Sequence, residues 1–282
     1  MCTNKKVVCQ ARIVENSAIA PDTFSLVLEA PELTSQVKPG QFIEVNLRQP
    51  DLVLPRPISV YSATPTLMSR PGRSETAMNY LEVRYQVMGE GTRRLSIMPA
   101  GTKLGAFGPL GNTWPIPEGT QRALLIGGGI GSAPLAMLAT QLAEQNVDQC
   151  MVQGGRSAEL LIACDHFEDV CDHHVIATDD GSRGYKGFVT APLKALLGDD
   201  SQCFDIAYVC GPEPMQEACF ALTRAAGIPT YVSLERMMAC GVGACLTCVV
   251  PTEDGLKRVC ADGPIFNAED VDWNEARSAR VH

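Results

Sequence analysis

The amino-acid sequence predicts an antiparallel β-barrel, then a parallel α/β domain, then a small cysteine-rich module at the C-terminal end. Three kinds of pattern predict it. Short apolar runs broken by proline and glycine fill residues 6–108, strands alternate with helices from Arg122 onward, and four cysteines gather between residues 240 and 260. We expect domains at 1–112, 113–235 and 236–282.

The composition is that of a globular protein. The 282 residues suffice for two domains and an appendage, and 45% hydrophobic with 20% charged residues is ordinary for such a chain. The formal net charge of -9 disfavours nucleic acid or an anionic membrane as a partner, since both usually require a basic patch. Most of the twelve cysteines are scattered, and the N-terminus leads into no apolar stretch. We therefore expect no signal peptide and a reducing, cytoplasmic location.

The barrel strands are predicted from closely spaced apolar runs. These runs are Val7–Val14, Thr23–Leu28, Gln41–Leu47, Ile58–Ala63, Leu81–Val87 and Lys103–Phe107. The polar segment Met68–Thr76, with its proline and glycine, is predicted to be an exposed loop.

Within the barrel, the stretch Arg56-Pro57-Ile58-Ser59-Val60-Tyr61 places an arginine before a strand. An arginine can bind a diphosphate with two hydrogen bonds, a serine hydroxyl can reach the edge of a flavin, and a tyrosine ring can stack on it. The same residues also suit an ordinary edge strand that begins with a proline.

A second barrel stretch, Arg84-Tyr85-Gln86-Val87-Met88-Gly89-Glu90-Gly91-Thr92, runs from a strand through a glycine turn into a helix expected at Arg93–Met98. Backbone amides at the start of a helix, together with the Thr92 hydroxyl, form an anion site that suits a cofactor diphosphate. A plain helix N-cap is the alternative interpretation.

The α/β domain begins with a glycine loop. Gly127-Gly128-Gly129-Ile130-Gly131 connects the strand Ala123–Ile126 to the helix Ser132–Gln145. A loop without side chains lets a diphosphate approach the amides at the helix start. The spacing departs from Gly-x-Gly-x-x-Gly, so it indicates a variant dinucleotide site. The charge-free run Ala123–Ala143 is accordingly a strand, loop and helix, and not a membrane span.

Further strand and helix pairs complete the α/β domain. They are Gln149–Gln153 with Ala158–Phe167, His174–Thr178 with Phe188–Leu197, and Asp205–Val209 with Glu213–Ala226, followed by the strand Thr230–Leu234. Ligands bind beyond the carboxyl ends of strands in such sheets, where Cys210-Gly211-Pro212 follows one of them.

Several side chains near that edge have two interpretations. Arg156 could pair with a ribose phosphate, and Asp179 and Asp180 could accept hydrogen bonds from ribose hydroxyls or only solvate a turn. Cys210 suits a buried position equally well, and Met215 suits a helix core. The histidines have no catalytic spacing and are expected at the surface; they are His166, His173, His174 and His282.

The C-terminal module is organised by its cysteines. Cys240, Cys245 and Cys248 have the spacing Cys-x4-Cys-x2-Cys, with Cys260 farther on. This pattern is typical of a [2Fe-2S] cluster, in which each iron takes two thiolates, and the glycines between the cysteines allow the tight turns required. Structural zinc or disulfides are the alternatives, but zinc sites usually pair cysteines in two short knuckles.

These motifs, in this order, resemble the ferredoxin–NADP reductase superfamily. With the cluster after the nucleotide domain, and with Ser233–Met238 and Cys260–Phe266, the chain resembles the electron-transfer subunits of class 1B dihydroorotate dehydrogenases. The resemblance implies FAD contacts at Arg56, Pro57, Ile58, Ser59, Arg84, Tyr85, Gln86, Gly91 and Thr92. It implies cluster ligands at Cys240, Cys245, Cys248 and Cys260. The pyridine nucleotide is expected between the glycine loop and the strand end, with contacts at Gly127, Gly128, Gly129, Gly131, Cys210, Gly211 and Pro212.

The same resemblance implies a function. Such subunits relay electrons from FMN on a catalytic partner, through [2Fe-2S] and FAD, to NAD⁺ in pyrimidine biosynthesis, in a heterotetramer with two copies of each chain. No base for dihydroorotate chemistry is expected here. Because Arg156 could pair with a ribose phosphate, NADP is an alternative to NAD. The alternatives are a related flavin and iron–sulfur subunit that serves sulfide, ferredoxin or hydrogenase chemistry, and a non-redox zinc module. The roles of Met68–Thr76 and of the tail Asn267–His282 stay open.

Overall fold

The computed structural model describes residues 5–64, 79–199 and 203–274. The predicted loop Met68–Thr76, the end of the tail and His282 lie outside them. Within the described residues, no helix has both the length and the apolar character needed to cross a membrane. The run Ala123–Ala143 is the expected strand, loop and helix.

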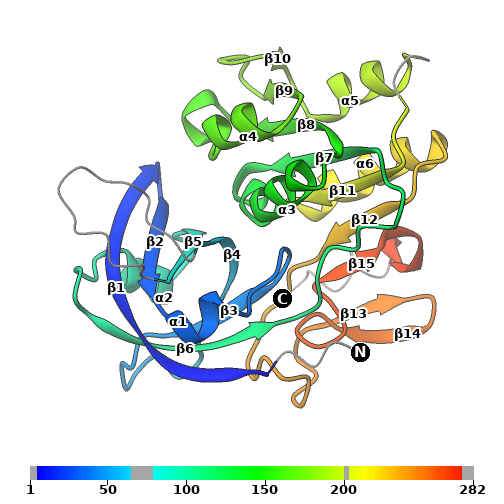
Figure 1. The fold of residues 1–282 in the computed structure, drawn as a ribbon. Coiled ribbons are helices and arrows are strands. Elements are labelled where there is room, and N and C mark those ends of the chain that lie inside the picture. Colours follow the sequence, from blue (N-terminus) through cyan, green and yellow to red (C-terminus); the bar gives the residue numbers. More distant parts are fainter. Residues whose placement is uncertain (1–4, 65–78, 200–202, 275–282) are drawn as a thin grey trace.

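The N-terminal part is a closed antiparallel barrel, as predicted (Figure 1). Its strands follow the order β1-β2-β5-β4-β3-β6 around the barrel. Alternate apolar side chains, such as Leu26 and Leu28 of β2, fill its interior. The strands are β1 (Val7–Ala20), β2 (Thr23–Glu29), β3 (Phe42–Asn46), β4 (Arg56–Thr64), β5 (Tyr80–Gln86) and β6 (Lys103–Leu110), and the helix α1 (Pro31–Thr34) follows β2.

The helix expected at Arg93–Met98 is α2 (Glu90–Ser96), which begins earlier than predicted. The Thr92 hydroxyl causes the difference, because it accepts hydrogen bonds from the amides of Met88 and Gly89 at 3.0 and 3.2 Å. The helix therefore starts inside the glycine turn, and Gly91 belongs to its first turn.

The second part is a seven-stranded sheet in the order β10-β9-β8-β7-β11-β12-β15, parallel except for the last strand. Helices α3 and α4 cover one face, and α5 and α6 cover the other. The strands are β7 (Arg122–Gly128), β8 (Asp148–Gly155), β9 (His173–Thr178), β10 (Tyr185–Lys186), β11 (Ile206–Cys210), β12 (Thr230–Ser233) and β15 (Ile265–Asn267). The helices are α3 (Ala133–Glu144), α4 (Cys164–Val170), α5 (Thr190–Leu197) and α6 (Glu213–Ala225).

One predicted helix of this domain is wrong. Ala158–Phe167 divides into a short 3₁₀ turn, η2 (Ala158–Leu160), and α4. Ala163 between them has a left-handed backbone with φ of 60°, and Ile162 inserts into the core. The apolar periodicity continued across this break, so the sequence alone did not reveal it.

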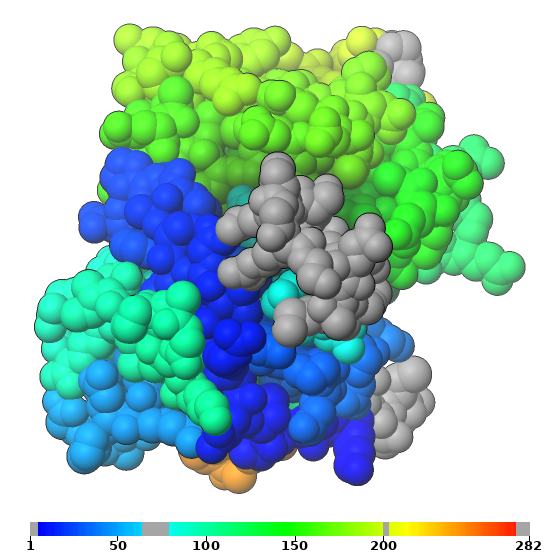
Figure 2. Space-filling model, turned by 60° about the vertical axis from the view of Figure 1, so that its left-hand side comes forward, coloured from blue at the N-terminus to red at the C-terminus, as the bar shows by residue number. Residues whose placement is uncertain are grey.

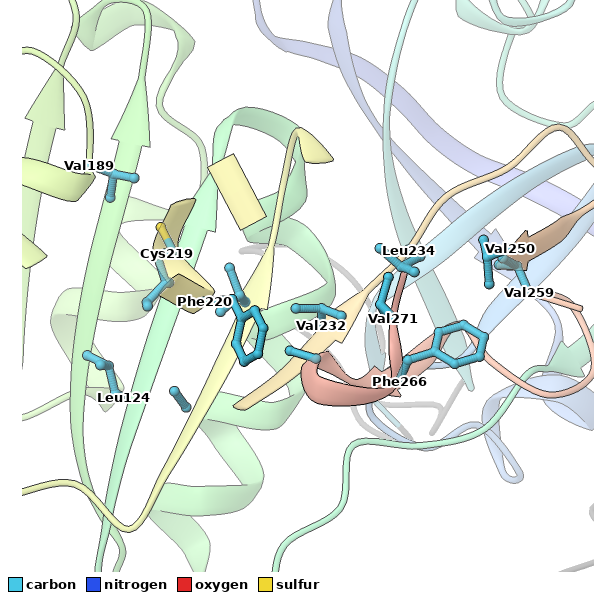
Figure 3. Close-up of a cluster of buried hydrophobic side chains, with 14 of the residues drawn as sticks. Leu124, Val189, Cys219, Phe220, Val232, Leu234, Val250, Val259, Phe266 and Val271 are labelled. Atoms are coloured by element: carbon cyan, nitrogen blue, oxygen red, sulfur yellow. The ribbon is translucent and has the colours of Figure 1, made fainter. Parts of the chain in front are cut away.

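The C-terminal module shares a core with the α/β domain. It contains the hairpin of β13 (Val249–Thr252) and β14 (Gly255–Arg258), after which β15 returns to pair with β12. Figure 3 shows one apolar cluster that runs from Phe220 through Val232 and Phe266 to Val250 of the hairpin. The segment predicted as a third unit therefore contributes a strand to the nucleotide sheet.

The barrel packs against the α/β domain through β4 and α3. Tyr61 of β4 is only 6% exposed and belongs to the same core cluster as the apolar face of α3. Figure 2 shows the barrel, in blue and cyan, directly beneath the green and yellow α/β domain. The strand that carries the arginine motif thus lies next to the helix that follows the glycine loop.

Candidate functional site

The first candidate site joins Arg56 at the start of β4 to the first turn of α2. A Cβ added to Gly91 would lie 2.8 Å from the Arg56 guanidinium carbon, so a side chain there would displace the guanidinium group. One guanidinium nitrogen of Arg56 donates to the carbonyl oxygen of Leu54, while its buried Nε has no hydrogen-bond partner among the described residues. A buried unsatisfied donor of a cation is costly, so this cradle fits an anionic group such as a diphosphate.

The neighbouring predicted contacts divide by side-chain direction. The Ile58 side chain lies in the barrel core, and so does that of Tyr85, whose hydroxyl donates to Asn16 at 3.1 Å. Pro57 is exposed, while Ser59, Arg84 and Gln86 are half-buried outside that core. Ile58 and Tyr85 can therefore offer a cofactor mainly backbone atoms, and the others can offer side chains.

The Tyr61 ring, which the sequence suggested could stack on a flavin, is instead covered by other side chains. The Arg84 guanidinium lies 3.5 Å from its ring centroid, and His166 meets the ring edge-on at 5.9 Å. Burial raises the pKa of Tyr61 to about 12. The ring is thus packed into the contact between the two domains.

The second candidate site lies where the strand order of the sheet reverses. β7 is flanked by β8 on one side and β11 on the other, so the chain turns to opposite faces after Gly128 and after Cys210. A crevice for ligands forms at this point in open parallel sheets. The structure therefore places the glycine loop and Cys210-Gly211-Pro212 side by side, with Gly127 opposite Cys210 in the ladder.

The two loops touch through their backbones. A Cβ on Gly131 would lie 2.5 Å from Gly211 Cα and 2.7 Å from the Cys210 carbonyl oxygen. Met215 packs against Gly128 so closely that a Cβ on Gly128 would lie 2.3 Å from the Met215 Sδ atom. Gly129 faces open space, whereas the Cys210 side chain is buried. A dinucleotide would therefore lie over these joined loops, and Cys210 could reach it only with its backbone.

The residues considered for the ribose lie at the same edge of the sheet. Arg156 follows β8 and is exposed, and its carbonyl oxygen accepts from the Asp180 amide at 3.2 Å. The Asp180 carboxylate accepts from the Ser182 hydroxyl at 2.6 Å, which lowers its pKa. Asp180 therefore stabilises its turn, and Asp179 is exposed beside it.

The third candidate site is the cysteine loop, in which the thiols form two pairs. The Cys245 thiol has hydrogen bonds with Thr247 and Cys240, which lower its pKa to about 6. The Cys260 amide donates to Cys248 Sγ at 3.5 Å, and burial with the neighbouring Cys248 raises the pKa of Cys260 to about 12. Two thiols for each of two metals is the arrangement that a binuclear cluster needs.

In the part of the chain that the structure describes, no three His, Cys, Asp or Glu side chains converge on one point. Gly241 has a left-handed backbone with φ of 61°, and Gly243 has one with φ of 81°. The loop is thus tightly wound around its cysteines, as a compact inorganic core requires.

One buried carboxylate near this loop was not found by sequence reasoning. Glu44 of β3 is 5% exposed, and its Oε1 has no hydrogen-bond partner among the described residues. A Cβ on Gly241 would lie 2.6 Å from that oxygen. Desolvation raises the pKa of Glu44. Because Glu44 pairs with Pro57 across the barrel ladder, it connects the cysteine loop to the strand of the arginine motif.

The surface expectation for the histidines is wrong for two of them. His174 has a side chain that is 6% exposed and meets Gln153 Oε1 at 2.9 Å, and His166 lies at the domain contact 3.1 Å from the Ala136 carbonyl oxygen. Burial lowers the pKa of both. His173 is exposed, as expected. The sequence signal for burial of His166 and His174 was their position within a helix and a strand, next to core residues.

Comparison with protein families finds two matching models. Residues 235–272 match the iron–sulfur cluster binding domain of dihydroorotate dehydrogenase B. Residues 125–220 match an oxidoreductase NAD-binding domain. The first match contains all four clustered cysteines, and the second contains both joined loops.

Whole-chain relatives are similar over nearly their full length. The dihydroorotate dehydrogenase B (NAD(+)) electron transfer subunit of Fusobacterium nucleatum is 37% identical, covering 92% of this chain and 96% of that one. The subunit of the same name from Shouchella clausii is 36% identical, with the same coverage. Among solved structures, an NADH-dependent reduced ferredoxin-NADP oxidoreductase superposes with a TM-score of 0.83 at 32% identity, covering 95% of this chain and 91% of that one.

Proposed function

Because the chain belongs to the family of dihydroorotate dehydrogenase B electron transfer subunits, we propose that it relays electrons between a dihydroorotate-oxidising partner and NAD⁺. The observation that carries this proposal is the contact of Gly241 in the cysteine loop with Glu44, whose ladder neighbour is Pro57 of the arginine motif. The cluster site and the flavin site are thus separated by one strand. Short separation is what electron transfer between two centres requires.

Three groups of residues would hold the cofactors. When bound, FAD exchanges hydride with NAD(H), and the [2Fe-2S] cluster exchanges single electrons. Arg56 and the first turn of α2 bind the FAD diphosphate, and Ser59, Arg84 and Gln86 contact the rest of the flavin from the outside of the barrel. The joined loops bind NAD(H), and Cys240 with Cys245 and Cys248 with Cys260 are the two thiolate pairs. The remaining FAD and NAD contacts that the sequence analysis expected, including Thr92 and Pro212, belong to the same proposal.

We further propose that the partner is an FMN-containing catalytic subunit, in a heterotetramer with two copies of each chain. The surface around the cysteines supports a docking role. Met237, Val242, Leu246 and Leu256 are exposed apolar side chains within or beside the cysteine loop and the β13–β14 hairpin. Apolar side chains gathered around a redox loop favour a protein partner over water. We also propose a cytoplasmic location. The proposed domains are 1–112 for FAD, 113–235 for NAD and 236–282 for the cluster.

A related activity is the second candidate. The similar solved structure belongs to an NADH-dependent reduced ferredoxin-NADP oxidoreductase, so this chain could instead serve a ferredoxin-linked partner and NADP(H). Arg156, exposed at the ribose edge, is compatible with a 2′-phosphate. We prefer NAD because the relatives that match along the whole chain carry NAD in their names.

The deciding experiment is reconstitution. The purified chain should reduce an artificial acceptor with NADH but should not oxidise dihydroorotate. Addition of an FMN-containing dihydroorotate dehydrogenase subunit should restore NAD-linked oxidation, and size-exclusion chromatography with light scattering should give a two-plus-two complex. Oxidation of dihydroorotate by this chain alone, or faster reduction by NADPH than by NADH, would contradict the proposal.

A further inference from the structure

A buried amide beneath the glycine loop holds the hydroxyl group at the start of α3. Gln153 of β8 is fully buried and lies opposite Gly127 in the β7–β8 ladder. Its Nε2 donates to Ser132 Oγ at 3.2 Å. Ser132 is fully buried as well, and a Cβ on Gly127 would lie 2.7 Å from the Ser132 hydroxyl oxygen. The hydroxyl therefore rests against the floor of the glycine loop, with Gln153 behind it.

The orientation of this amide is fixed by its other partners. Gln153 Nε2 also donates to the carbonyl oxygen of Ile162 at 2.8 Å, and a carbonyl can only accept. Gln153 Oε1 consequently faces His174 Nε2 at 2.9 Å and Cys164 Sγ at 3.5 Å. Every hydrogen-bonding direction of the buried amide is used, and such fully satisfied networks are rigid.

The glycine loop packs closely through Gly127, Gly128 and Gly131, but Gly129 lies open. Gly129 has a left-handed backbone with φ of 56° and no atom within 4 Å of a Cβ position. A loop that is flexible before binding loses entropy when it closes on a ligand, so a support that orders it beforehand increases affinity. The Ser132 hydroxyl is a polar contact from beneath, and its own position is set by Gln153.

We propose that Gln153 is a positioning residue for NAD(H): through Ser132 it fixes the glycine loop in the shape that receives the dinucleotide, without touching the dinucleotide itself. This inference rests on the proposed function, in which that loop binds NAD(H). It predicts that the amide of Gln153 affects nucleotide affinity and leaves hydride transfer unchanged.

The same strand contains a matched control. Gln149 is 2% exposed, and its Nε2 donates to the carbonyl oxygens of Ala139 and Val170 at 3.0 and 3.3 Å. It has the same chemistry and burial as Gln153, but it lies at the end of β8 away from the glycine loop. Loss of its hydrogen bonds should lower stability without altering the loop.

The test compares Gln153→Met with Gln149→Met, since methionine keeps the length of the side chain and removes its hydrogen bonds. Stopped-flow reduction of the bound flavin by NADH gives a Kd and a limiting rate. Gln153→Met should raise Kd about fivefold to tenfold, the effect of one buried hydrogen bond, with the limiting rate unchanged. Gln149→Met should lower the melting temperature about as much as Gln153→Met does, and it should leave Kd at the wild-type value.

A double-mutant cycle with Ser132→Ala separates positioning from general destabilisation. Ser132→Ala should raise Kd as Gln153→Met does, and the double variant should add nothing further, because both changes break one connection. Ser132→Ala also carries the test if Gln153→Met does not fold. Equal Kd values for Gln153→Met and Gln149→Met, or additive effects in the double variant, would refute the inference alone. A wild-type protein whose flavin NADH does not reduce would instead refute the proposed function.

Discussion

The guanidinium group of Arg56 lies directly against Gly91, although the two residues belong to different elements of the barrel. A side chain at Gly91 would displace the guanidinium group, which positions a cation with an unsatisfied buried nitrogen at the first turn of α2.

Gly91→Ala should cause loss of FAD from a protein that stays folded. The new methyl group would lie 2.8 Å from the Arg56 guanidinium carbon and displace it. Alanine favours a helix by about 1 kcal/mol over glycine, so the melting temperature of the flavin-free protein should not fall. Gly89→Ala is the control, since a Cβ there meets nothing within 4 Å. Flavin absorbance per chain measures the FAD content. Equal FAD content in both variants would contradict the proposal that Arg56 and Gly91 form the FAD site.

Arg56→Ala should weaken FAD binding by about tenfold to a hundredfold, the usual effect of losing a charge-assisted hydrogen bond. Arg93→Ala provides the comparison, because Arg93 is an exposed arginine of α2 that pairs with Glu90 at 2.7 Å. Titration of the flavin-free proteins with FAD, followed by fluorescence quenching, gives both affinities. If the flavin released from the wild type is FMN, our assignment of a diphosphate site is wrong.

Serine at Cys240, Cys245, Cys248 or Cys260 should abolish the cluster. Each thiol belongs to one of the two pairs, so loss of any one leaves an iron with one protein thiolate in place of two. The anaerobically purified wild type should contain about two irons and two acid-labile sulfides per chain. Cys203→Ser, at an exposed cysteine outside the loop, should retain both. Stoichiometric zinc without sulfide in the wild type would support the zinc alternative instead.

Gly131→Ala should eliminate NADH binding while FAD is retained. Its methyl group would lie 2.5 Å from Gly211 Cα, and backbone cannot move aside as a flexible side chain can. Gly198→Ala is a suitable control, because its nearest contact would be 3.3 Å, at a helix end remote from the loops. Flavin reduction by NADH and flavin content, measured on the same sample, separate the two sites. If the Gly131→Ala protein bound NADH with normal affinity, the joined loops would be excluded as the NADH-binding site.

Stability should fall as the solution is acidified, partly because of His174. Burial lowers the pKa of this imidazole below its unfolded value of about 6.5, so the unfolded state binds its proton more readily. The contribution of neutral His174 is therefore complete above about pH 6.5 and is lost as the pH falls through the lower folded pKa. Glu168 and Arg183 also face the ring.

The measurement is the melting temperature from about pH 7.5 to about pH 5, a range in which histidine titrates. His174→Gln should show a shallower decline than the wild type, because the group that must take up a proton is absent. His173→Gln, at the exposed neighbouring position, should keep the wild-type slope. Equal slopes for all three proteins would exclude a role for His174.

The sequence alone determined the features that depend on local pattern. Alternating apolar runs predicted the barrel, and alternating strands and helices predicted the parallel sheet, because side-chain periodicity is a property of neighbours along the chain. The spacing of Cys240, Cys245 and Cys248 predicted the cluster loop for the same reason.

Contacts between distant segments were decided by the tertiary structure. The sequence contains no signal that Arg56 would lie on Gly91, that Glu44 would reach Gly241, or that β15 would join the nucleotide sheet. It also misplaced His174, whose burial depends on what α4 and β8 place around it. These arrangements arise when separate elements bury their apolar faces together, and the free energy of that packing belongs to the whole fold and not to any one segment.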